Sequence, residues 1–127
     1  MESGSYLFED ECKRIIGACF DVHNSLGHGF LESVYHEALA IAFIEMGIPF
    51  ESEKKLEVWY KSHKLEKFFT ADFVCFDKII IELKACDGLL PIHTAQVLNY
   101  LKATNHQLGI LVNFGTPRVL IKRVILS

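Results

Sequence analysis

The sequence predicts a mixed α/β domain in which helices flank a β-sheet. Before residue 50, apolar residues recur at helical spacing in two stretches. After residue 50, short runs rich in β-branched and aromatic residues alternate with turn residues, and one further helical segment interrupts them. The expected order is helix, helix, three strands, helix, two strands.

Both helices of the first half have clear stops. The first is expected over residues 8–26, where apolar side chains recur every three or four positions before Gly27-His28-Gly29. The second is expected to begin near Phe30 and to stop at Gly47-Ile48-Pro49. The residues that we expect this second helix to turn inward are Leu31, Val34, Ala38, Leu39, Ala42, Phe43 and Met46.

Three strands are expected next. The first covers residues 50–60, and a turn at residues 61–64 leads into the second, which includes residues 68–76. Asp77-Lys78 is long enough for a tight hairpin turn into a third strand over residues 78–84.

The last third of the chain returns to a helix. Pro91 is a favourable first-turn residue for a helix that runs to about Thr104. Strands over residues 108–114 and 119–126 then close the fold. Because no repeat, linker or low-complexity segment is present, residues 1–127 are expected to form a single domain.

Composition limits the classes of function. The 127 residues are 50% hydrophobic, which suits a packed core and excludes general disorder. A net charge of -3 gives no overall positive field for nucleic acid, so any such contact must use local patches. These patches are Lys13-Arg14, Lys54-Lys55 and Lys122-Arg123.

The sequence favours a cytoplasmic protein. Its N-terminal residues lack a basic segment followed by an apolar one, and the longest apolar run, residues 38–44, is too short to cross a bilayer. The four cysteines show no C-x-x-C spacing, so we expect reduced thiols.

Charged residues with chemical potential lie between residues 71 and 84. Side chains alternate along a strand, so Glu82 and Lys84 share one face while Leu83 points into apolar packing. If the second and third strands pair antiparallel about residues 77–78, Asp72 lies roughly opposite Glu82.

Two carboxylates so placed need a partner. Each raises the pKa of the other, because two negative charges repel. A divalent cation removes this repulsion, and hard oxygen ligands suit magnesium or manganese. The simpler interpretation is that Glu82 and Lys84 are solvent-facing residues of an amphipathic strand. Against it, the flanking Ile79-Ile80-Ile81 and Phe73-Val74-Cys75-Phe76 are apolar on both faces.

Two further polar motifs lie in the predicted helices, Gly29-x-x-Glu32-x-x-Tyr35 and Gln96-x-x-x-Tyr100. Taken alone, Glu32 is an acidic residue in a first helical turn, where the helix dipole favours it. Together with Ala71-Asp72 and Glu82-x-Lys84, in this order, the motifs resemble the GxxExxY protein family of the PD-(D/E)XK nuclease superfamily.

The resemblance implies a restriction-endonuclease-like core and a nuclease that uses Mg²⁺ or Mn²⁺ to hydrolyse nucleic acid, with DNA as the first expectation. Asp72 and Glu82 would be metal ligands, and the Leu83 carbonyl would complete the site. Glu32 would add an acidic ligand, directly or through water. Lys84 would orient or deprotonate the attacking water, or stabilise charge on the phosphate.

The resemblance also implies accessory roles, and it has two departures. Gln96, Tyr100 and Tyr35 would shape the site or touch the substrate. Ala71 stands where the superfamily's name has proline, and Thr70 stands where many relatives have a basic residue.

Alternatives stay open on the sequence alone. The same fold could serve as a non-catalytic module that binds nucleic acid or a protein partner. A zinc site built from the cysteines with His23, His28 and His36 is a third option, although their spacings match no standard ligand pattern. Edge pairing through the last strand would allow a homodimer.

Overall fold

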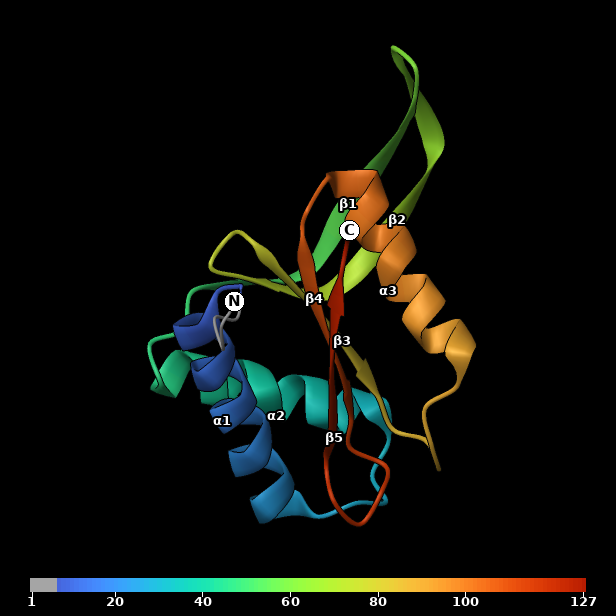
Figure 1. The fold of residues 1–127 in the computed structure, drawn as a ribbon. Coiled ribbons are helices and arrows are strands. Elements are labelled where there is room, and N and C mark those ends of the chain that lie inside the picture. The colour runs from blue at the N-terminus through green and yellow to red at the C-terminus, as the bar shows by residue number, and fades with distance from the viewer. Residues whose placement is uncertain (1–6) are drawn as a thin grey trace.

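The computed structural model describes residues 7–127, which form three helices and a five-stranded sheet (Figure 1). In chain order the elements are α1 (Glu9–Leu26), α2 (Glu32–Glu45), β1 (Phe50–Tyr60), β2 (His63–Cys75), β3 (Ile79–Lys84), α3 (Pro91–Thr104), β4 (Leu108–Asn113) and β5 (Leu120–Ile125). This order confirms the predicted α/β class. Residues 1–6, where the sequence predicts no targeting segment, lie outside the described residues. None of the helices in the described part of the chain is long and apolar enough to cross a membrane.

The strands lie side by side in sequence order, from β1 at one edge to β5 at the other. Every neighbouring pair is antiparallel except β3 and β4, which are parallel. A parallel pair needs a crossover connection, and α3 supplies it. The result is a mixed sheet with β3 near its centre.

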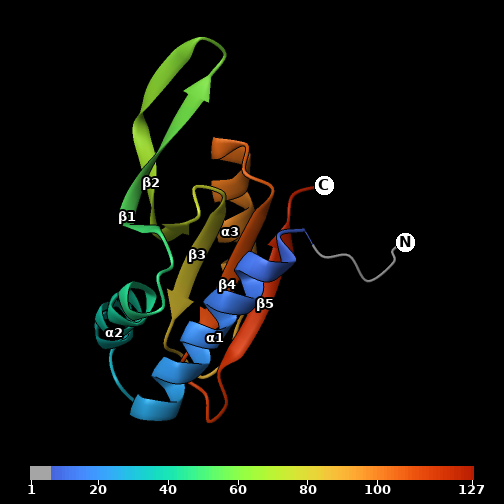
Figure 2. The same cartoon turned by 90° about the vertical axis from the view of Figure 1, so that its left-hand side faces the viewer.

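Helices cover both faces of the sheet (Figures 1 and 2). Side chains of α1 and α2 pack with Ile79, Ile81 and Leu83 in one core, whereas α3 packs with Ile80 in a second core on the other face. This alternation follows the two-residue period of a strand. Leu83 therefore points into apolar packing, as predicted, and Glu82 belongs to the face that α3 covers.

Helix α2 begins at Glu32, later than expected, and several of its apolar residues do not face the core. Leu31 precedes the helix and is 76% exposed, while Val34 and Met46 are also exposed, so the prediction that these three turn inward was wrong. The buried stripe is Tyr35, Leu39, Ala42 and Phe43. Apolar residues surround this helix on most sides, and only one stripe of a helix can face a sheet.

The turn between β2 and β3 has three residues, Phe76, Asp77 and Lys78, because Cys75 pairs with Ile79. The predicted two-residue turn was therefore too short. Phe76 and Asp77 have φ angles of 57° and 59°, in the left-handed region. Left-handed residues suit hairpin turns because they match the right-handed twist of the strands.

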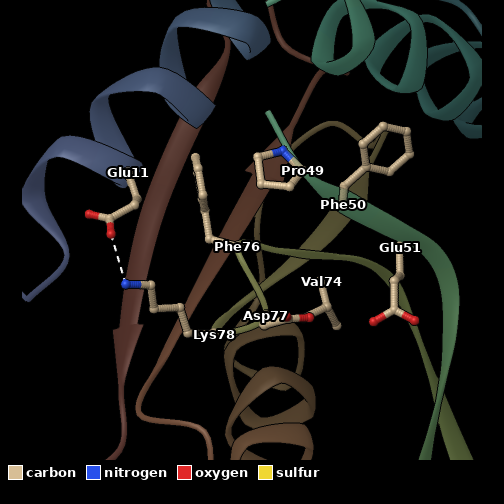
Figure 3. Close-up of a pocket in the computed structure, with 8 residues that line it drawn as sticks. All are labelled: Glu11, Pro49, Phe50, Glu51, Val74, Phe76, Asp77 and Lys78. Atoms are coloured by element: carbon tan, nitrogen blue, oxygen red, sulfur yellow. Dashed lines mark ion pairs between the residues drawn. The ribbon is translucent and has the colours of Figure 1, made fainter. Parts of the chain in front are cut away.

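A pocket of about 370 Å³ borders this turn, between α1 and the start of β1 (Figure 3). It is lined by Glu11, Pro49, Phe50, Glu51, Val74, Phe76, Asp77 and Lys78. Lys78 Nζ lies 2.8 Å from Glu11 Oε2, and this contact lowers the pKa of the Glu11 carboxyl. Lys78 thus neutralises the charge of Glu11. The pocket lies at the end of β3 that adjoins the turn, away from Lys84.

All four cysteines are free, and three of them are buried. Burial raises the pKa of the Cys19 thiol to about 12, so this thiol stays protonated and behaves as a small apolar side chain.

The loop after β3 is held against the end of β4. The Phe114 N–H donates to the Lys84 carbonyl at 2.9 Å. The Asn113 side chain accepts from the Cys86 N–H at 3.1 Å and donates to the Cys86 carbonyl at 3.0 Å. At Gly115 a side chain would overlap the backbone nitrogen and oxygen of Cys86. These contacts fix the backbone that follows Lys84.

We predict that Gly115→Ala lowers the free energy of unfolding by about 1–3 kcal/mol, because the two backbones would have to move apart. Urea denaturation measures this loss. Gly88→Ala is the matched control in the same loop region, since a Cβ at Gly88 would meet nothing within 4 Å in the described chain. Equal stability of the two variants would show that the contact at Gly115 is not a tight one.

Candidate active site

Strands β2 and β3 separate at Asp72 and Glu82. Their last backbone pair is Phe73 with Ile81. Beyond it, each carboxylate bonds to the backbone of the other strand: the Asp72 N–H donates to Glu82 Oε1 at 3.1 Å, and the Leu83 N–H donates to Asp72 Oδ2 at 2.8 Å. Asp72 and Glu82 thus lie opposite one another, as the predicted register requires. At this end of the strand pair, hydrogen bonds from side chains replace the backbone hydrogen bonds between β2 and β3.

Strand β2 also leaves its regular pairing with β1 at Asp72. The residue that would lie opposite, Glu53, has a φ of 50°, and neither residue belongs to the pairing between the strands. Ala71 and Phe73, which would share a face in a regular strand, belong to the cores on opposite sides of the sheet. The strand therefore turns over at Asp72. Strained backbone of this kind often accompanies functional sites, and no sequence signal marks Glu53 for it.

Glu82 is a buried acid, with 6% of its surface exposed. Burial raises the pKa of its carboxyl to about 8, and the negative charge of Asp72 acts in the same direction. The Asp72 N–H and the Lys84 ammonium oppose this rise without cancelling it. At neutral pH and without a cation, one proton is therefore held at this carboxylate pair.

Helix α2 brings Glu32 and His36 to the same place. Partial burial and the charge of Asp72 raise the pKa of Glu32, while Lys84 and His36 act against the rise. The His36 Nε2 atom lies 3.3 Å from the Asp72 carbonyl oxygen and 4.0 Å from Asp72 Oδ1. Its ring stacks on Phe73 with centroids 4.3 Å apart. Sequence reasoning considered His36 only as a candidate zinc ligand, although its position four residues after Glu32 was a usable signal for this site.

A groove of about 510 Å³ opens between α2 and the strands β1 and β2. It is lined by Glu32, Ser33, His36, Glu37, Ala40, Ser52, Glu53 and Asp72. Among these described lining residues four carry carboxylates and none is Lys or Arg. Such a lining favours a cation over a bare phosphate group.

Helix α3 contributes Tyr100 from the other side of the sheet. Tyr100 is buried and its ring lies 5.1 Å from that of Phe69. Burial raises the pKa of its hydroxyl to about 12, with smaller contributions from the charges of Glu82 and Asp72. The hydroxyl therefore stays protonated and can donate a hydrogen bond. Gln96 lies one turn earlier on the same helix and is partly buried.

Tyr35, by contrast, does not join Asp72 and Glu82 at the candidate site. It is fully buried, its ring stacks on Phe114 with centroids 4.8 Å apart, and its hydroxyl donates to the Gly27 carbonyl at 2.6 Å. The hydroxyl also accepts from the Phe30 N–H at 3.3 Å. These contacts close the loop that precedes α2. Tyr35 therefore supports the site through packing, and its buried ring has no surface for a substrate.

The oxygen donors at the split fit a magnesium or manganese ion. The carboxylates of Asp72 and Glu82 adjoin, and the Leu83 carbonyl faces the same gap as its N–H, because both groups of a strand residue point to one side. Within residues 7–127, no group of three or more His, Cys, Asp or Glu side chains is arranged to hold a metal ion. Magnesium commonly binds through one or two carboxylates and several waters, which agrees with this pair. The charge of Asp72 raises the pKa of Glu32, and the place of Glu32 among the ligands stays a prediction.

We predict that, in EDTA, the stability of the protein falls between pH 4.5 and 8 through Glu82. The carboxyl has a folded pKa of about 8 against an ordinary 4.5, so in this range the folded state binds the extra proton. A raised folded pKa gives stability that is complete below the ordinary value and is lost as the pH rises to the folded one, with a slope of at most about 1.4 kcal/mol per pH unit.

Urea unfolding at a series of pH values measures this slope. Glu82→Gln, which mimics the protonated acid, should remove the part of the slope that Glu82 contributes. Parallel stability curves for the two proteins would mean that Glu82 is ionised in the folded state throughout this range.

Comparisons with known proteins agree with this architecture. A model of the PD-(D/E)XK nuclease superfamily matches residues 9–124. Among solved structures, that of SSO0001 is similar in fold, with a TM-score of 0.61 and 21% identity over 94% of this chain and 62% of that chain. This chain thus spans less than two thirds of that protein. A comparison with curated proteins found no match.

Proposed function

The chain belongs to the PD-(D/E)XK nuclease superfamily, and we propose that it is a metal-dependent nuclease that hydrolyses phosphodiester bonds of nucleic acid, DNA in the first place. Its mixed sheet and flanking helices form the expected restriction-endonuclease-like core. One observation carries the proposal: Asp72 and Glu82 bond reciprocally to each other's strands, beside Lys84. Within the superfamily, we assign the chain to the GxxExxY family on its four motifs.

The proposed cation is Mg²⁺ or Mn²⁺, held by Asp72, Glu82 and the Leu83 carbonyl, with Glu32 as a further acidic ligand that binds directly or through water. A bound cation supplies Lewis-acid stabilisation of the phosphate and a nucleophilic water near neutral pH. The raised pKa of Glu82 supports this assignment, because two adjacent carboxylates ionise together only beside a positive charge.

The remaining groups act on the substrate and the water. Lys84 follows Glu82 on the same strand face, where its ammonium can orient the water or stabilise charge that develops on the phosphate. The protonated Tyr100 hydroxyl can donate a hydrogen bond, and Gln96 can contact the substrate from the same helix. His36 keeps the Asp72 backbone in place from α2.

A second candidate function is a non-catalytic module that binds nucleic acid or a protein partner on the same fold. The acidic lining of the groove and the net charge of -3 favour a protein partner for such a module, because neither feature attracts a polyanion.

Two further features belong to the proposal. The free cysteines support a cytoplasmic location, where thiols stay reduced. Strand β5 lies at an edge of the sheet and supports a homodimer formed by edge pairing.

We predict cleavage of labelled single- or double-stranded DNA or RNA in Mg²⁺ or Mn²⁺, and none in EDTA. Asp72→Asn, Glu82→Gln and Lys84→Met should each lower the rate about 100-fold or more, because each removes charge from the reacting centre. Gel electrophoresis of the labelled strands measures the rates. Glu45→Gln, a change in an exposed acid at the end of α2, is the matched control and should cut at the wild-type rate.

Calorimetric titration with Mn²⁺ separates the two candidate functions. The nuclease proposal expects millimolar or tighter binding that Asp72→Asn weakens. Cleavage that persists undiminished in the three site variants would show that the wrong residues are named. No cleavage and no metal binding by the folded protein would favour the non-catalytic module.

A further inference from the structure

The outer part of the β1–β2 hairpin projects beyond the body of the sheet (Figures 1 and 2). We define residues 54–68 as the hairpin arm. Its charge is opposite to that of the rest of the protein, since it carries five lysines and two glutamates, a net charge of +3. The whole chain has a net charge of -3, so the residues outside the arm carry -6. The charged residues of the arm are Lys54, Lys55, Lys61, Lys64, Lys67, Glu57 and Glu66.

The arm also exposes three large aromatic side chains. Trp59 is 57%, Tyr60 is 60% and Phe68 is 50% exposed. Leu56, at the base of the arm, is by contrast buried in the core under α3. Large aromatic rings are costly to leave in water, and a group of them beside cations marks a surface that binds something.

Two of these rings share a face with lysines. Glu57 lies opposite Phe68, and Trp59 lies opposite Lys64. A register shift lies between these two pairs, and a 3.0 Å ion pair between Glu57 and Lys64 joins them across it, so Trp59 and Phe68 lie on one face of the arm. Lys55 Nζ lies 4.5 Å from the centre of the Phe68 ring. The arm thus alternates flat apolar rings with ammonium groups.

We propose that the hairpin arm binds single-stranded nucleic acid, with bases stacked on Trp59 and Phe68 and phosphates met by Lys61 and Lys67. Aromatic platforms beside positive charges are how proteins bind single strands. Stacking on the arm tolerates any sequence, because every base has a flat π-face. In a duplex the base faces are already stacked and are not free for these rings.

The arm leads to the candidate active site. Phe68 precedes Asp72 on β2 by four residues, about 13 Å along an extended strand. A strand stacked on the arm is therefore directed toward the carboxylates. This inference rests on the proposed function, because it takes nucleic acid as the substrate. It adds that the substrate is an unpaired, single-stranded segment.

A second copy of the chain that pairs arm to arm is a less suitable occupant. Two arms that meet would bring together two surfaces of net charge +3, which repel one another. A polyanion instead meets the arm with complementary charge.

Trp59 is the only tryptophan of the chain, so its fluorescence reports on the arm directly. In EDTA, titration with oligodeoxythymidine should quench the emission saturably, and raising the salt concentration should weaken binding. A blunt duplex of equal length should quench less and bind more weakly. Binding of the duplex as tight as that of the single strand would overturn the proposal.

Variants test which side chains carry the binding, with anisotropy of a labelled oligonucleotide as the measurement. Trp59→Ala should weaken the affinity about 5- to 150-fold, the range for one lost stacked base. The double variant Lys61→Ala/Lys67→Ala should lower the slope of log K against log salt by about 1.4. Phe20→Ala, a truncated aromatic on α1 with a similar exposure of 48%, is the control and should bind as the wild type does. Circular dichroism checks that each variant is folded.

The outcomes separate the arm from the active site. Loss of binding in Trp59→Ala together with unchanged binding in Phe20→Ala supports the arm, whether or not the protein cuts. Wild-type binding by folded Trp59→Ala overturns the arm and leaves the nuclease proposal in place. A dimer that Trp59→Ala converts to a monomer, with unchanged affinity for the oligonucleotide, would assign the arm to a second copy and also overturn the proposal.

Discussion

Two acids on neighbouring strands each accept a hydrogen bond from the backbone of the other strand, and this exchange keeps the end of the β2–β3 pair open. The Asp72 and Glu82 carboxylates occupy the positions where backbone hydrogen bonds of the sheet would otherwise continue, at 2.8 Å and 3.1 Å, respectively, from the amide nitrogens that donate to them. The amides are thereby paired although the strands have parted. One carboxylate oxygen of each acid is used in this way, and the other remains for a ligand. The site depends on this arrangement, because it sets charge at the end of a hydrophobic sheet.

Rigid elements place the remaining groups around the split. Helix α2 presents Glu32 and His36, helix α3 presents Tyr100 from the other side, and Asn113 pins the loop that follows Lys84. Sites supported by helices and strands are held more accurately than sites on free loops. Only the hairpin beyond the Asp72 break extends away from this frame, and it carries the opposite charge. In the proposed function, the negative body would hold the cation and the positive arm with its aromatic rings would hold the nucleic acid.

Most of the fold followed from the sequence because its signals are local. Strand alternation and the position of the turn were enough to place Asp72 opposite Glu82. The sequence could not show what tertiary contacts decide. Apolar residues surround α2, so periodicity did not reveal that Leu31 would lie in solvent. The left-handed Glu53 that lets β2 turn over has no residue signal, since glutamate is not a typical choice for that conformation. Tyr35 fitted a motif, yet its hydroxyl closes a loop inside the protein.

Anomalous scattering from a crystal soaked in Mn²⁺ tests the central claim most directly, because it locates the cation without relying on activity. The claim predicts one strong peak at the β2–β3 split, within about 2.0–2.6 Å of oxygens from both Asp72 and Glu82, the range for hard cations. A crystal of Asp72→Asn should lose the peak. A manganese peak elsewhere on the wild-type protein, with none beside Asp72 and Glu82, would contradict the claim.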